Sequence, residues 1–148
     1  MQNLKFFTKE QFETYIAVIE TIIETDSYAL SPEKTALRMD NFLSTVDSPT
    51  VKQLPILLYY VRHLLPLNIW KFKKFHNLSK EDRKKALKNF IKKKHFFRDI
   101  ARAMKILTCV PYYSSVEGRK SVGFVEFEER NSFANHNTNP INHDEPQV

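Results

Sequence analysis

Glycine is nearly absent from this sequence. Only two of the 148 residues are glycine, against about 7% in average proteins. Glycine supplies the positive φ angles of tight turns and lets the backbone approach phosphates closely. The deficit therefore argues against an all-β sandwich, a P-loop and a dinucleotide-binding turn, and it favours helices. The motifs GxGxxG, GxxxxGK[ST], GxSxG and HExxH are also missing.

Cysteine and long apolar runs are scarce as well. Cys109 is the single cysteine, so an internal disulfide is excluded, and its position near a helix end favours a buried apolar role over a nucleophile. The longest apolar run, residues 54–67, is broken by Arg62 and His63 and is too short to span a bilayer. The N-terminus carries no apolar leader. We expect a cytoplasmic protein, or one peripheral at the inner face of a membrane.

Metal ligands and catalytic pairs are not evident. His63, His76 and His95 stand 13 and 19 residues apart, without cysteine or carboxylate partners at ligand spacing. The acids Glu81 and Asp82 are explained by the first turn of a helix, where the helix dipole favours negative charge. We therefore expect no metal site, no cofactor bound by this chain and no enzymatic activity of its own.

Helix start signals are frequent. Thr8 with Gln11 forms a capping-box pattern, Ser31 and Ser48 each precede a proline, and Ser79 precedes two acids. Apolar residues recur at helical spacing behind each signal and again in residues 97–107. The sequence predicts an all-α single domain of about five helices over residues 1–130, followed by a disordered polar tail at residues 131–148.

Prolines and the last apolar residues carry three further expectations. Pro55 is expected to kink the third helix, and Pro66 either to end it or to start a short helix. Pro111 is expected to end the last helix. Residues Ser121 to Phe127 alternate in polarity, which predicts a short extended C-terminal segment.

Positive charge is concentrated in one segment. Residues 71–105 hold fourteen Lys and Arg against three acids, within a net charge of +6 for the chain. A solvated helix face, an anionic membrane surface and nucleic acid each fit such a segment. No nucleic-acid motif accompanies the charge, so nucleic acid is the least expected partner. The outward positions predicted for an anionic surface are Arg83, Lys84, Lys85, Lys88 and Lys92.

A family resemblance rests on phrases that recur in order. Phe75, Leu78, Ser79 and Arg83 form a phrase F-x-x-L-S-x-x-x-R. It is followed by FFRDIARAMKILTCVPYYS and then by SVGF. These phrases, over roughly residues 10–127, resemble the small helical subunit of membrane-associated flavin dehydrogenases named for gluconate 2-dehydrogenase subunit 3. They are also similar to the N-terminal helical region of long-chain alcohol oxidases of the glucose-methanol-choline oxidoreductase superfamily.

The resemblance implies a non-catalytic accessory subunit. Its partner would be a separate FAD-dependent alcohol or sugar oxidoreductase, which holds the FAD. The matching positions expected to contact the partner are Arg98, Arg102, Lys105, Tyr112, Tyr113, Ser114, Gly123 and Phe124. The chain departs from secreted members by lacking a twin-arginine leader, and from the oxidases by lacking a flavin domain. The alternative is a standalone basic protein that binds a membrane surface or nucleic acid through residues 83–105.

Overall fold

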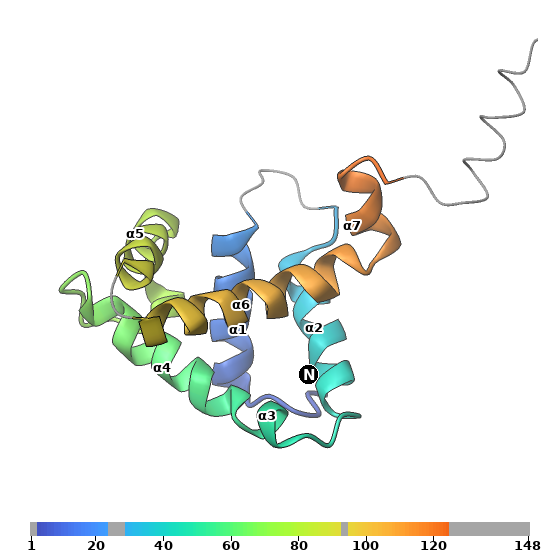
Figure 1. The fold of residues 1–148 in the computed structure, drawn as a ribbon, viewed down its shortest axis with the longest axis horizontal. Helices are drawn as coiled ribbons and strands as arrows, with labels where there is room; N and C mark the ends of the chain where they lie inside the picture. The colour runs from blue at the N-terminus through green and yellow to red at the C-terminus, as the bar shows by residue number, and fades with distance from the viewer. Residues whose placement is uncertain (1–2, 24–28, 93–94, 125–148) are drawn as a thin grey trace, which may run out of the picture.

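The fold is all-α, as the sequence predicts. The computed structural model describes residues 3–23, 29–92 and 95–124, and these residues contain no strand. α1 lies at the centre and packs against α2, α4, α5 and α6, with α6 running across it in Figure 1. The elements in order are α1 (Lys9–Ile22), α2 (Pro32–Leu43), α3 (Pro49–Lys52), α4 (Leu54–Leu67), the 3₁₀ helix η1 (Phe75–Asn77), α5 (Lys80–Ile91), α6 (His95–Tyr113) and α7 (Val116–Ser121).

The predicted helix starts are confirmed. Thr8 accepts a hydrogen bond from the Gln11 backbone, and the Gln11 side chain accepts one from the Thr8 backbone. Ser31 and Ser79 cap α2 and α5 with the side-chain oxygen alone, each accepting a backbone N–H three residues ahead. Ser48 precedes α3 but makes no side-chain cap. Each cap satisfies an N–H that has no partner within the helix.

Proline acts differently from the prediction at the third helix. Instead of one kinked helix, two helices form, and Gln53 separates α3 from α4. Pro55 lies in the first turn of α4, where its missing N–H would have had no helical partner anyway. Pro66 lies within the last turn of α4, which ends at Leu67.

Pro111 does not end α6, contrary to the prediction. The helix continues to Tyr113. A proline at position 111 cannot donate to the carbonyl of Leu107, four residues earlier. Tyr15 of α1 donates its hydroxyl to that carbonyl instead, at 2.6 Å. A residue 92 positions away thus satisfies the group that proline leaves free.

The extended segment predicted from Ser121 is wrong over the residues that can be judged. Ser121 is the last residue of α7, and Gly123 follows in a turn with φ of 77°. Such a left-handed residue after a helix is the usual place for glycine. Phe124 donates its N–H to the carbonyl of Arg119 at 3.1 Å, which closes this turn. Residues 125–127, and the predicted tail, lie outside the described residues.

A buried carboxylate fixes the entry into α1. Asp40 of α2 is 1% exposed. Its two oxygens accept the backbone N–H groups of Lys5, Phe6 and Phe7 at 2.7, 3.0 and 2.8 Å. These three bonds hold the segment before α1 against α2, and they satisfy a carboxylate that is removed from water.

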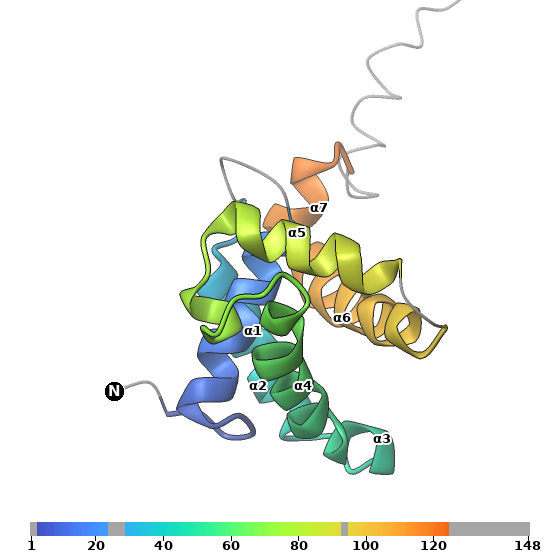
Figure 2. The ribbon, with the colours of Figure 1, turned by 90° about the vertical axis from the view of Figure 1, so that its left-hand side faces the viewer.

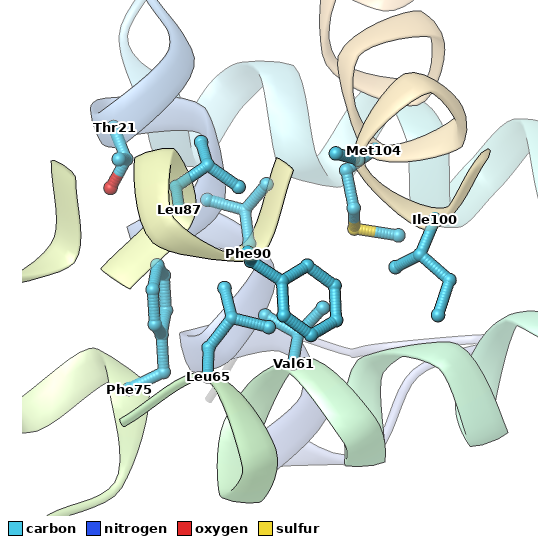
Figure 3. A pocket seen from close by; sticks show the side chains of 10 residues that line it. Thr21, Val61, Leu65, Phe75, Leu87, Phe90, Ile100 and Met104 are labelled. Carbon is cyan, nitrogen blue, oxygen red and sulfur yellow. The ribbon is translucent and has the colours of Figure 1, made fainter. Parts of the chain in front are cut away.

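Phe90 attaches α5 to the rest of the core. Its ring enters the space between α4 and α6, where it faces Val61, Leu65, Ile100 and Met104 (Figure 3). The void left among these side chains has a volume of only about 10 Å³. That is room for about one water molecule, so this part of the interior is packed and offers no space for a substrate.

Candidate partner-binding surface

An open apolar groove crosses one face of the domain. It has a volume of about 760 Å³ and lies between α6 and the helices α2, α3 and α4. A volume of this size is typical of binding sites rather than of packing defects. Its lining is formed by Met39, Phe42, Leu43, Thr50, Val51, Gln53, Leu54, Ile56, Leu57, Tyr60, Asp99, Ile100, Ala103, Ile106 and Leu107.

The groove exposes apolar side chains that the fold does not use. Phe42, Ile56 and Ile106 are 60%, 56% and 54% exposed. Each comes from a different helix, and they form one patch because α2, α4 and α6 border the same groove. Among the described residues Asp99 is the one charged residue of the lining, and it lies exposed in the first turns of α6. An apolar surface that carries a single negative charge suits an amphipathic segment with one cation.

The sequence prediction did not include this groove. Phe42 lies beside the apolar stripe of its helix, and Ile56 and Ile106 lie outside the core-facing stripes of α4 and α6. Apolar residues beside or outside such a stripe were the available signal. Which of them share a surface depends on how α2, α4 and α6 pack, and helical periodicity contains no information on that.

The predicted YYS contact residues lie at the corner between α6 and α7. Tyr112 is 2% exposed, and its hydroxyl oxygen accepts the backbone N–H of Ala29 at 3.2 Å. Tyr113 is 38% exposed and stacks edge-on against the Tyr112 ring. Ser114 is exposed, and its carbonyl accepts a hydrogen bond from Arg119. Tyr112 therefore covers the domain's own core, and Tyr113 offers a surface.

Two small residues that the sequence prediction did not name build this corner. Ser115 is 1% exposed, donates its hydroxyl to the Tyr112 carbonyl at 2.6 Å and accepts the Gly118 N–H at 2.8 Å. A Cβ on Gly118 would lie 2.1 Å from the Tyr112 carbonyl oxygen. A side chain larger than hydrogen would overlap this oxygen and force the backbone to shift. Glycine allows the close approach through which α7 turns back onto α6.

The remaining predicted contact residues form two separate groups. Gly123 forms the turn after α7, and the ring of Phe124 lies under the Arg119 guanidinium, 5.9 Å from its carbon to the ring centroid. Arg98, Arg102 and Lys105 are exposed on α6, along the side that faces away from the core. The structure thus separates an α6 basic strip from the α6–α7 corner.

The basic face is narrower than predicted. Arg83 points inward: it donates to the Ala17 carbonyl at 3.2 Å and to Glu20 at 2.8 Å, with 11% of its side chain exposed. Lys85 and Lys88 of α5 and Lys92 directly after it are exposed as predicted, and Lys84 is half-buried. Arg83 was assigned to the outside because the apolar stripe of α5 does not include position 83. Glu20 on α1 attracts it.

Among the described residues, the titratable groups give no sign of a reactive centre. Burial raises the pKa of the Cys109 thiol, so a smaller fraction of it is present as the nucleophilic thiolate. Burial also disfavours the charged form of His76 and therefore lowers its pKa. The Nδ1 atom of His76 lies 3.3 Å from the Thr14 hydroxyl. In the described part of the chain no three His, Cys, Asp or Glu residues are placed to hold a metal ion.

The comparisons with known proteins add no relative. No family model, no curated protein and no solved structure matches the chain. Among the helices described, none combines the length and the apolar character that crossing a membrane requires. The class that fold and surface define is a small all-α domain with an open apolar groove.

Proposed function

We propose that this chain is a non-catalytic accessory subunit of a separate FAD-dependent oxidoreductase that acts on alcohols or sugars. The apolar groove receives an amphipathic helix of that partner. The observation that carries the binding role is the groove itself, with more than half of Phe42, Ile56 and Ile106 in solvent. The identity of the partner rests on the sequence phrases that resemble gluconate 2-dehydrogenase subunit 3.

The geometry supports a helix as the occupant. The groove is bounded by helical walls, and such grooves bind amphipathic helices through apolar residues spaced at i, i+3, i+4 and i+7. Aromatic and aliphatic side chains that become fully desolvated supply most of the affinity at such interfaces. Asp99 at the edge of the apolar lining selects a partner helix with a Lys or Arg facing it.

Affinity isolation from the native host tests the proposal. The tagged chain should co-purify at a fixed ratio with a larger protein that shows flavin absorbance. Phe42→Glu or Ile106→Glu should reduce recovery of that flavoprotein about tenfold or more, because a buried charge opposes docking. Tyr59→Glu is the matched control: Tyr59 is 61% exposed, close to the 60% of Phe42, and does not line the groove.

The possible results distinguish the accessory role from the use of the groove as the docking site. Recovery of the flavoprotein with wild type and Tyr59→Glu, but not with the groove variants, supports both parts. Equal recovery with the groove variants rejects the groove as the docking site. If no flavin-containing protein is recovered in any preparation, the accessory role is rejected.

A further inference from the structure

Among the residues that the structure describes, the two most exposed large apolar side chains lie in the link between α4 and α5. Trp70 is 86% exposed and Phe72 is 87% exposed. They alternate with lysines in the sequence Trp70-Lys71-Phe72-Lys73-Lys74, which contains no helix or strand. Neither ring contributes to the core, so folding does not explain their presence.

The backbone holds Trp70 outward at a cost to the fold. Its φ angle is 55°, and it is the only non-glycine residue with a positive φ among those described. Trp70 donates its N–H to the Leu67 carbonyl and Lys71 donates to the Pro66 carbonyl, both at 3.1 Å. This is the hydrogen-bond pattern of a helix end at which glycine normally takes the left-handed position. A large aromatic residue there is unfavourable for the backbone and gains no packing.

The surroundings of the link are positively charged. Residues 71–92 contain nine Lys and Arg against two acids, and one of these nine, Arg83, points inward, toward Glu20. The link and α5 lie together at the left-hand end of the molecule in Figure 1, which faces the viewer in Figure 2. An ion pair of 3.6 Å between Lys71 and Asp82 ties the link to the first turn of α5. Exposed lysines of α5 and the two aromatic residues of the link therefore belong to the same end of the molecule.

We propose that residues 67–74 form an interfacial loop that binds an anionic lipid bilayer, with Trp70 and Phe72 inserted at headgroup depth. Trp is enriched at the membrane–water interface, and lysines beside it contact anionic headgroups while their stems lie along apolar surface. A protein partner fits less well, because lysine is depleted at protein–protein interfaces. The proposal is independent of the proposed oxidoreductase partner and of the groove.

Trp70 is the only tryptophan of the chain, so its fluorescence reports directly on this loop. Vesicles of phosphatidylcholine with phosphatidylglycerol should shift its emission to shorter wavelength, and brominated lipid should quench it. Pure phosphatidylcholine should bind roughly tenfold more weakly or worse, since each lysine near an anionic surface contributes about a fivefold factor. Added salt should release the protein from the anionic vesicles.

A glycine variant separates binding from folding. Trp70→Gly places the preferred residue at the left-handed position, so thermal stability should stay equal or rise. Vesicle co-sedimentation of the full chain should fall about tenfold or more in Trp70→Gly and in Phe72→Ser, and remain unchanged in the control Tyr59→Ser. The inference is overturned if either loop variant sediments like wild type. It is equally overturned if brominated lipid leaves Trp70 unquenched, or if only oligonucleotides alter its emission.

Discussion

The hydrogen bond between Tyr15 and the Leu107 carbonyl should be energetically coupled to Pro111. Tyr15 is 1% exposed, and its hydroxyl lies 2.6 Å from the Leu107 oxygen. Pro111 has no N–H for that oxygen, so Tyr15→Phe leaves a carbonyl inside the protein without its donor. The free energy of unfolding should fall by about 1–3 kcal/mol, the usual cost of an unsatisfied buried polar group.

A double-mutant cycle isolates this explanation from a general effect at Tyr15. In Pro111→Ala, the alanine N–H can donate to the Leu107 carbonyl within α6. Tyr15→Phe in that background removes a second donor and not the only one. Its cost should drop to about 0.5–1 kcal/mol, which gives a coupling free energy of about 1 kcal/mol.

Urea unfolding followed by far-UV circular dichroism on the four full-length proteins measures the cycle. The slopes of the transitions should agree, so that differences in midpoint report stability alone. An equal cost of Tyr15→Phe in both backgrounds refutes the reasoning. The helix would then tolerate Pro111 for another reason, and the Tyr15 hydroxyl would not compensate for the missing N–H.

Three further predictions concern polar anchors and glycines. Asp40→Asn should lower the free energy of unfolding, measured in urea, by about 1–3 kcal/mol. The substitution replaces one carboxylate oxygen by an NH₂ group, which cannot accept the backbone N–H groups that Asp40 binds. An unchanged unfolding midpoint would contradict this prediction. Hydrogen bonds from Arg62 and Lys74 lower the pKa of Glu10 from 4.5 to about 2. Its contribution to stability is therefore present above pH 4.5 and lost as the pH falls toward 2, and Glu10→Gln should flatten this part of a stability–pH profile. Gly118→Ala should cost about 1–3 kcal/mol by overlap with the Tyr112 carbonyl and speed amide exchange in α7. Asparagine at Gly123, which tolerates positive φ, should be nearly neutral; similar losses at the two glycines would reject the steric argument.

Features that depend on neighbours in sequence were predictable. The caps at Thr8, Ser31 and Ser79 were predictable, because each is a contact between residues that are three positions apart. Helical periodicity likewise located the buried stripe of α6, which includes Ile100, Ala101 and Met104.

Features that depend on distant residues were not predictable. Pro111 was expected to end α6, but the compensating donor is Tyr15 on another helix. Arg83 was placed outside, but Glu20 on α1 attracts it inward. Nothing near Asp40 in sequence indicates that it binds three amides more than thirty residues earlier. In each case the deciding partner comes from an element that periodicity cannot place.

Two of the residues that carry the family resemblance are poor probes of partner binding, for a structural reason. Tyr112 is buried, and Gly123 forms a turn. Substitution of Tyr112 would disturb the α6–α7 corner, and a residue that disfavours positive φ at Gly123 would strain the turn after α7, before either change disturbed a contact with a partner. Loss of binding in such variants would therefore not distinguish docking from folding. Phe42 and Ile106 are exposed and lie off the core, so variants there separate the two effects. The groove, and not the YYS phrase, is where the accessory role should be tested.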